Sequence, residues 1–409
     1  MARTRKYAYR KGAVSQTAAV AAALIVIVAV VAGAYLILNS RSPATSTPTS
    51  STSPTISSQT TPTSATSQMS TTSSTGLPST LPAESLSETG STLLYPLFQI
   101  WAANFSLTYT NVHITTAGTG SGTGISDAET GTVQIGASDA YMTNAQITQY
   151  PDMLNIPLAI SAQNIDYNIP GIPQSDHLNL SGPILAGIYN GSITYWDNAQ
   201  IKAANPALAN QLPHQTIIPI RRSDGSGDTF IFTQYLSFTT ASWNSSVGYG
   251  TTVSWPSTPT LTAALGNGGM VEKCNATSYS VAYIGISYLN EALKDGLGYA
   301  YLKNQAGNYV APTQVNIQAA ANALVGKTPA DERISLVFAP GADSYPIINY
   351  EYAIVSKTQS DSNMALVLRT LLTWAVTTGE QPYFLDQVHF IALPQSIVQL
   401  SIEQINEIS

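Results

Sequence analysis

A stretch rich in glycine and small hydroxyl side chains stands where a predicted strand turns into a predicted helix. It reads Arg221-Arg222-Ser223-Asp224-Gly225-Ser226-Gly227-Asp228-Thr229-Phe230-Ile231-Phe232. A helix start presents free N–H groups, glycine lets a ligand approach the backbone, and an arginine forms paired hydrogen bonds with an anion. The stretch therefore predicts an anion-binding site at a strand-to-helix junction.

Helical and strand-like patterns alternate from Ser91 onward, which indicates an α/β architecture. Apolar spacing predicts a helix around residues 93–105 and a last helix that opens with Pro394. The other predicted strands are 112–116, 133–137, 156–160, 216–220, 281–286 and 350–355, and the other predicted helices are 184–189, 229–236, 314–324 and 364–376. This part of the chain is long enough to divide into two lobes.

Residues 1–39 predict a signal or membrane-anchor segment. Basic residues precede an apolar run from Ala18 to Leu38, which has about the length needed to cross a hydrocarbon core. The charge bias places the N-terminus in the cytoplasm. A retained anchor is favoured over a cleaved signal, since the run is long and no Ala-x-Ala site is obvious. Residues 11–14 also resemble the pilin-type signal of archaeal surface binding proteins, which is cut after its glycine and keeps the apolar helix.

Residues 40–87 consist almost entirely of Ser, Thr and Pro, which predicts a disordered stalk without a core of its own. The folded part would then lie outside the cell, tethered to the plasma membrane. Asn-x-Ser/Thr sequons fit such an exposed, glycosylated surface; they begin at Asn104, Asn179, Asn190, Asn244 and Asn275.

Charge and cysteine usage exclude several classes of protein. The formal net charge is −7, so nucleic acid is not expected as a partner. Cys274 is the only cysteine, which leaves no disulfide framework and no cysteine-based metal site. The four histidines are scattered without zinc-type spacing. We expect no metal and no cofactor, and we expect a monomer.

Three further positions suit an oxyanion. Gly90-Ser91-Thr92 begins a predicted helix, Ser121 lies in the glycine-rich loop 118–124, and Asp139 follows a buried strand. Each also has a simpler interpretation, as a helix cap or a flexible turn. A dinucleotide site at the loop is disfavoured, because Thr123 occupies the third glycine position of that motif.

The chain from about Ser91 to Gln399 resembles the substrate-binding proteins of high-affinity phosphate ABC transporters. The resemblance is carried by Gly90-Ser91-Thr92 with Trp101-Ala102, by Gly120-Ser121 with Gly131-Thr132-Val133 and Gly136-Ala137-Ser138-Asp139, by Ile188-Tyr189-Asn190-Gly191 with Trp196-Asp197, by residues 222–227 before Phe230-Ile231-Phe232-Thr233, and by Val247-Gly248 before Val253-Ser254-Trp255-Pro256.

The resemblance implies a type II periplasmic-binding-protein fold, with a mixed sheet flanked by helices in each lobe and the ligand in the cleft between them. Lobe I would comprise residues 88–163 and 345–409, and lobe II residues 164–344. It implies inorganic phosphate as ligand, delivered to an ABC permease with its ATPase subunits. The positions carried over as phosphate-binding are Thr92, Leu93, Ser121, Asp139, Arg222, Ser226, Gly227 and Asp228.

The charged residues Arg222, Asp224 and Asp139 suggest how such a site would bind and select phosphate. Arg222 would neutralise the anion, and Asp224, two residues on and on the same side of an extended segment, would orient the guanidinium. Asp139 accepts hydrogen bonds only, so it needs a ligand oxygen that carries a proton. Phosphate has such an oxygen and sulfate near neutral pH does not, so sulfate would leave a buried carboxylate unpaired.

Two positions depart from the family pattern. Leu93 stands where the family usually has phenylalanine, a position that acts through its backbone. Asp228 stands where the family has threonine, and an ionised carboxylate there would repel the anion. Either Asp228 turns away and contributes only its N–H group, or it accepts a second proton and the site prefers monobasic phosphate.

Non-enzymatic phosphate capture is the leading hypothesis. The alternatives are binding of another oxyanion (sulfate, molybdate, tungstate or arsenate), an extracellular phosphatase, and a purely structural surface protein. A phosphatase is disfavoured because Ser226 lacks flanking nucleophile-elbow glycines: Asp224 and Asp228 occupy those positions.

Overall fold

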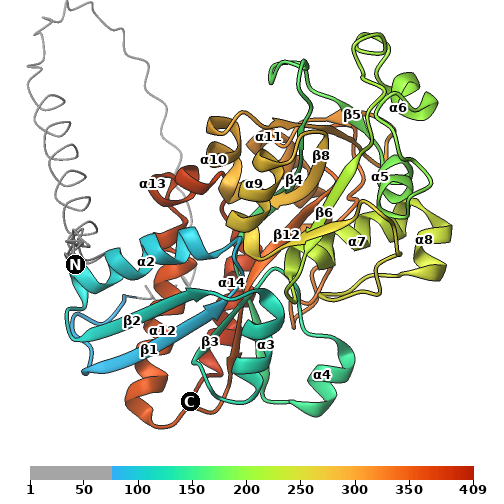
Figure 1. The fold of residues 1–409 in the computed structure, drawn as a ribbon. Helices are drawn as coiled ribbons and strands as arrows, with labels where there is room; N and C mark the ends of the chain where they lie inside the picture. Colours follow the sequence, from blue (N-terminus) through green and yellow to red (C-terminus); the bar gives the residue numbers. More distant parts are fainter. Residues whose placement is uncertain (1–75) are drawn as a thin grey trace, which may run out of the picture. The chain divides into compact units, whose positions relative to one another are not determined.

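The computed structural model describes residues 76–409 (Figure 1). The predicted anchor, residues 1–39, lies outside the described residues, as does most of the predicted stalk. Within residues 76–409, no helix is both long and apolar enough to cross a membrane.

The expected C-terminal limit of the stalk, residue 87, is wrong. Strand β1 (Glu84–Gly90) begins inside that segment and pairs in parallel with β2 (Val112–Gly118) along its whole length. Leu86 on this strand is buried and belongs to the core. A serine-rich composition hid the strand, because a single buried leucine gives too little periodicity to detect.

A nine-stranded sheet forms the centre of the fold, in the order β2-β1-β3-β12-β4-β8-β6-β7, with β9 also paired to β4. The bounds of the remaining strands of this sheet are β3 (Ile135–Ser138), β4 (Met153–Asn168), β6 (Ile218–Arg222), β7 (Thr262–Ala264), β8 (Ser280–Gly285), β9 (Gly298–Tyr299) and β12 (Ile348–Ser356). A separate small sheet has the order β11-β10-β5, from β5 (Asn179–Leu180), β10 (Tyr301–Lys303) and β11 (Tyr309–Val310).

Strand β4 connects the two lobes. Its residues from Met153 to Ala162 pair antiparallel with β12, whereas those from Gln163 to Asn168 pair antiparallel with β8. Below, the first lobe denotes β1, β2, β3 and β12 with their helices, and the second lobe denotes β6, β7, β8 and β9 with theirs.

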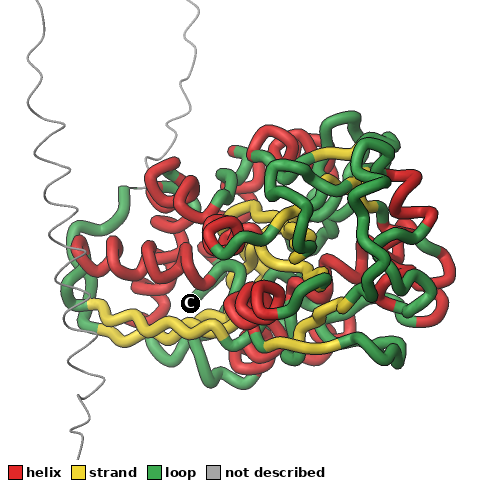
Figure 2. Tube along the Cα trace, turned by 45° about the horizontal axis from the view of Figure 1, so that its top comes forward, coloured by secondary structure: helices red, strands yellow, loops and turns green. Residues whose placement is uncertain are grey.

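Helices surround the strands (Figure 2). In the first lobe α2, α3, α12 and α14 contact the sheet, and in the second lobe α7 and α9 contact β8. The bounds are α2 (Tyr95–Thr108), α3 (Ser121–Glu129), α4 (Asn144–Gln149), α5 (Gly182–Tyr189), α6 (Ala199–Ala204), α7 (Gly227–Thr239), α8 (Ala241–Ser246), α9 (Gly266–Ala276), α10 (Leu289–Lys294), α11 (Gln314–Leu324), α12 (Ser362–Ala375), α13 (Pro382–Leu385) and α14 (Gln395–Asn406), with short 3-10 turns η1 (Ile286–Tyr288), η2 (Val325–Lys327), η3 (Thr378–Glu380) and η4 (Asp386–Val388).

Two predicted helix starts differ from the structure. Pro394 is the N-cap of α14 rather than its first helical residue. Helix α2 begins at Tyr95, and Ser91 lies before it as a turn residue whose Oγ accepts hydrogen bonds from the N–H groups of Leu93 and Leu94. The hydroxyl therefore caps a tight turn, and this turn places residues 91–93 against the second lobe.

Candidate functional site

Arg222 is the last residue of β6 and is 2% exposed. Its Nε atom donates to Oδ1 of Asp224 at 2.8 Å, and its Nη2 atom donates to Oδ2 of the same carboxylate. Its Nη1 atom donates to Oδ2 of Asp228 at 2.7 Å. Burial alone would lower the pKa of Arg222, but the two carboxylates outweigh burial and raise that pKa, so the guanidinium remains charged.

The start of α7 follows directly. Ser226 is the N-cap, and its Oγ atom accepts from the N–H group of Thr229 at 3.3 Å. A Cβ atom at Gly227 would lie 2.6 Å from Oγ of Ser121 and closer still to the Asp139 carboxylate. Glycine is therefore required where the first turn of α7 meets the first lobe.

The Asp228 carboxylate faces the centre of the site. The side chain is fully buried, and its Oδ2 atom accepts from Nδ2 of Asn267 at 2.7 Å while Oδ1 accepts from Nε2 of Gln163 at 3.1 Å. Burial and the charge of Asp139 raise the pKa of Asp228 to about 7. Its direct contact with Arg222 places this carboxylate beside the positive charge of the site. Both sequence-based hypotheses for Asp228 therefore stay predictions: that it turns away from the anion, or that it accepts a second proton from it.

Asp139 follows β3 in the first lobe and is 2% exposed. Its Oδ1 atom accepts from Oγ of Ser91, and its backbone N–H donates to Oγ of Ser121 at 3.2 Å. Burial, followed by the nearby carboxyl of Glu351, raises the pKa of Asp139 well above its ordinary value. A buried acid of this kind favours partners that share or supply a proton.

The two lobes meet at the site through direct hydrogen bonds. Oγ1 of Thr92 accepts from the backbone N–H and from Nδ2 of Asn267, at 3.2 and 3.0 Å. The backbone oxygen of Leu93 accepts from Oγ of Ser287 at 2.8 Å. The N–H of Gly122 donates to the backbone oxygen of Gly225 at 2.9 Å. Residues far apart in sequence therefore face one another across the lobe boundary.

The structure brings all the sequence-predicted site residues together. Asn267 joins Thr92 to Asp228, Arg222 joins Asp228 to Asp224, and Gly227 contacts both Asp139 and Ser121. Ser226 is buried beside them as the cap of α7, and Leu93 follows Thr92 in the same turn.

Sequence reasoning missed three polar residues of this network: Gln163, Asn267 and Glu351. Asn267 lies in the first turn of α9, inside a Gly-Asn-Gly-Gly run without a distinctive motif. Glu351 had a usable signal, because it interrupts the otherwise apolar pattern of a predicted buried strand. Gln163 is the residue of β4 at which strand pairing passes from β12 to β8, which no sequence pattern reveals.

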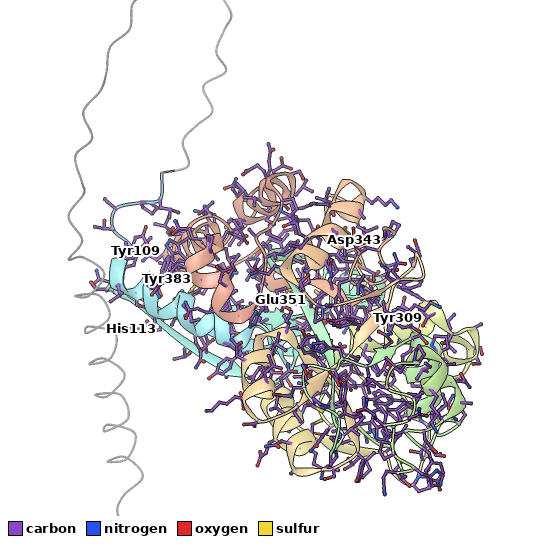
Figure 3. The ribbon with its side chains drawn as sticks, turned by 90° about the horizontal axis from the view of Figure 1, so that it is seen from above. Tyr109, His113, Tyr309, Asp343, Glu351 and Tyr383 are labelled. Carbon is purple, nitrogen blue, oxygen red and sulfur yellow. The ribbon has the colours of Figure 1, made fainter. Side chains whose placement is uncertain are left out.

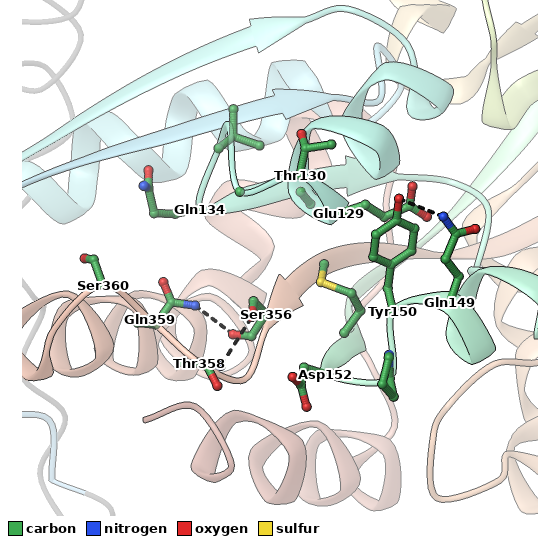
Figure 4. Close-up of a pocket in the computed structure, with 15 residues that line it drawn as sticks. Glu129, Thr130, Gln134, Gln149, Tyr150, Asp152, Ser356, Thr358, Gln359 and Ser360 are labelled. Carbon is green, nitrogen blue, oxygen red and sulfur yellow. Dashed lines mark hydrogen bonds between the residues drawn. The ribbon is translucent and has the colours of Figure 1, made fainter.

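A cavity of about 480 Å³ lies elsewhere, between the end of α3, the start of β4 and the end of β12 (Figure 4). Its lining includes the acidic residues Glu129 and Asp152 and no lysine, arginine or histidine. Such a lining does not suit an anion. The arginine-centred network between the lobes is therefore the candidate site.

Two α/β lobes that meet over a buried polar site are typical of solute-binding proteins. Residues 44–377 match the model of the PBP superfamily domain. The chain is 34% identical over 350 residues to the phosphate-binding protein PstS of Methanocaldococcus jannaschii, covering 81% of this chain and 87% of that protein. The PstS protein of Xylella fastidiosa strain 9a5c is 31% identical, with 77% and 83% covered. The chain belongs to this family of PstS-type phosphate-binding proteins within the PBP superfamily.

Solved structures agree on the fold. A phosphate-binding protein from Stenotrophomonas maltophilia aligns with a TM-score of 0.61 at 18% identity, covering 78% of this chain and 93% of that one. The expected two-lobed α/β architecture is thereby confirmed.

Proposed function

We propose that this protein captures inorganic phosphate outside the cytoplasm and delivers it to an ABC permease for import, without catalysing a reaction. The observation that carries the proposal is that a buried arginine of the second lobe, Arg222, and a buried acid of the first lobe, Asp139, both lie where the start of α7 meets the first lobe. Relatives named as phosphate-binding proteins cover most of the chain, which supports phosphate as the ligand.

The proposed ligand contacts combine one charge with many neutral donors. Arg222 would supply the positive charge, and the start of α7 with Ser226 and Gly227 would supply N–H and hydroxyl donors. From the first lobe, the backbone at Leu93 and the hydroxyls of Thr92 and Ser121 would complete the shell, and Asp139 would accept the ligand's own hydrogen.

Selectivity would follow from Asp139. A carboxylate buried to this degree is destabilised unless its partner donates a hydrogen bond. Phosphate offers a protonated oxygen at physiological pH, whereas sulfate, molybdate and tungstate near neutral pH do not. A site of this kind rejects an analogue that lacks the hydrogen by about 10⁴-fold or more. Arsenate carries the same hydrogen, so this acid alone does not discriminate against it.

Closure would be of the hinge type around β4. We propose residues 88–163 and 345–409 as lobe I and residues 164–344 as lobe II, supported by the change of pairing partner along β4 at Gln163. The N-terminal segment would tether the protein to the plasma membrane, with the Ser/Thr/Pro-rich stretch as a spacer, and the protein would act as a monomer.

Isothermal titration of the full-length protein with phosphate, sulfate and molybdate tests the proposal. We expect saturable binding of phosphate with one site per chain and no measurable heat from the other two. A chromogenic phosphate ester should be released no faster than in buffer. Tight binding of sulfate, or turnover of the ester, would contradict the proposal.

A further inference from the structure

Glu351 is a buried acid in the middle of the fold that the proposed phosphate contacts do not use. It lies on β12 with no exposed surface, and Figure 3 shows it near the centre of the described region, between Tyr109 and His113 at one end and Tyr309 at the other. A carboxyl group in such a place is destabilised as an ion unless something compensates it.

The hydrogen bonds of Glu351 leave one oxygen free for another carboxyl group. Oε1 accepts from Oγ of Ser161 at 2.5 Å and from Nδ2 of Asn349 at 3.1 Å. Oε2 has no hydrogen-bond partner. Asp139 is a neighbour, because Nδ2 of Asn349 donates both to Oε1 of Glu351 at 3.1 Å and to the backbone oxygen of Asp139 at 3.4 Å, and the Glu351 carboxyl raises the pKa of Asp139. Two carboxyl groups that meet in a buried site cannot both remain ionised, so they share a proton. Burial raises the pKa of Glu351 to about 7.

Asp228 adds another carboxyl group to the same charge balance. The charged and titratable groups near Asp228 and Asp139 are the guanidinium of Arg222, the carboxyl of Glu351, and the phenols of Tyr283 and Tyr288. The Asp224 carboxylate binds the other edge of the same guanidinium. With every acid ionised, four negative charges would surround one positive charge before any anion arrives. Binding of an anion therefore requires that some of these carboxyl groups are protonated.

We propose that phosphate capture is coupled to proton uptake by Glu351 and Asp228, so that the site takes monobasic phosphate and holds it more tightly as the pH falls. The inference rests on the proposed function. A proton shared between Oε2 of Glu351 and the Asp139 carboxyl would remove one of the two negative charges and leave Asp139 able to accept the ligand's hydrogen. A protonated Asp228 would no longer repel the anion beside Arg222. The protons come from solvent and return to it on release.

In this account Glu351 is a positioning residue that acts through Asp139. A merely structural Glu351, holding Ser161 and Asn349, would leave the number of protons taken up unchanged when it is replaced. The decisive quantity is therefore proton uptake, which isothermal titration gives from heats measured in two buffers of different ionisation enthalpy. Each coupled proton steepens the pH dependence of affinity by up to about tenfold per pH unit.

The experiment titrates the full-length protein with inorganic phosphate between pH 5 and 8, as wild type, E351Q, D228T and E332Q. Glu332 is a matched control, because it is a buried acid held by Ser401 and Gln404 rather than by site residues. We expect wild type to take up about one proton or more at pH 7 beyond the ligand's own titration. E351Q and D228T should each take up fewer and bind about fivefold or more tightly at pH 8, whereas E332Q should match wild type.

Equal proton uptake in wild type, E351Q and D228T would overturn the inference even if phosphate binds well. If E351Q does not fold, D228T alone still decides, because it removes a carboxyl that the wild type must protonate. Absence of phosphate binding by wild type at every pH would instead refute the proposed function, and the two failures are thereby distinguished.

Discussion

The Nη1 atom of Arg222 lies 2.7 Å from the Oδ2 atom of Asp228, and both side chains are buried. The other edge of the same guanidinium is held by Asp224. Three charged groups thus lie at the junction of β6 and α7, and one of them, Asp228, stands where the resembled family has threonine. The charge beside Arg222 therefore depends on whether Asp228 is protonated, because the pKa of Asp228 is raised to about 7.

Replacing Arg222 by lysine should weaken phosphate binding more than tenfold. A lysine ammonium cannot bridge Asp224 and Asp228 as the planar guanidinium does, so the orientation of the positive charge is lost. Lysine retains the charge, which avoids leaving two buried carboxylates unpaired, a change that typically costs about 3–5 kcal/mol. Titration calorimetry with a check by circular dichroism measures the effect, and near-wild-type affinity would remove Arg222 from the site.

Replacing Asp139 by asparagine should reduce the preference for phosphate over sulfate by at least about tenfold. The amide can donate to an unprotonated oxyanion oxygen, so sulfate would no longer leave a buried carboxylate unpaired. Competition between sulfate and labelled phosphate measures the ratio. Asp197→Asn is the control, since Asp197 pairs with His214 and Lys202 and contacts none of the proposed site residues through a salt bridge. An unchanged ratio in Asp139→Asn would show that selectivity has another source.

Replacing Gly227 by alanine should weaken phosphate binding about a hundredfold. The added Cβ atom would clash with Oγ of Ser121 and with the Asp139 carboxylate, so the first turn of α7 could not approach the first lobe. Gly326→Ala is a matched control, because a Cβ atom there meets nothing within 4 Å. If both variants bind phosphate equally well, the close approach of the lobes at Gly227 does not matter for capture.

The protein should be more stable to heat at pH 5 than at pH 7.5. Burial raises the pKa values of Glu88, Glu332 and Glu380 to about 8, whereas the unfolded chain keeps values near 4.5. Between these values the unfolded state loses protons that the folded state retains. The stabilising contribution of these three groups is therefore fully present below about pH 4.5 and is lost as the pH rises toward 8, by at most about 1.4 kcal/mol per pH unit for each group.

Thermal unfolding of the full-length protein at both pH values checks this expectation. We predict a Tm higher at pH 5 by about 5 °C or more. Glu88→Gln should raise the Tm at pH 7.5 and flatten the dependence, since the amide carries no charge to bury. A higher Tm at pH 7.5 in the wild type would show that these acids are not protonated in the folded protein.

Helices and strands were predicted correctly where the spacing of apolar residues within the element itself determines its bounds. Helix α11 has the predicted bounds, because an apolar spacing follows the capping hydroxyl of Thr313. Strand β4 is longer than predicted at both ends. Its C-terminal extension was missed because Gln163, Asn164 and Asp166 are buried polar residues that break the apolar run. Their burial depends on pairing with β8, a long-range contact that no window of sequence contains.

Site residues that belong to a sequence motif could be predicted, whereas residues that reach the site only through long-range packing could not. Arg222 and Asp139 each stand at a strand end, which the sequence shows. Asn267 and Glu351 reach the same place from α9 and β12, and only the packing of the two lobes brings them there. The polar network that tunes a site is thus less visible in sequence than the groups that contact a ligand.

The most direct test of the central claim is the ratio of phosphate to sulfate affinity of the full-length protein, measured by competition calorimetry near neutral pH. Phosphate should bind at least about ten-thousandfold more tightly, because only phosphate brings a hydrogen to the buried Asp139. Comparable affinities for the two anions, or no saturable binding of phosphate, would contradict it.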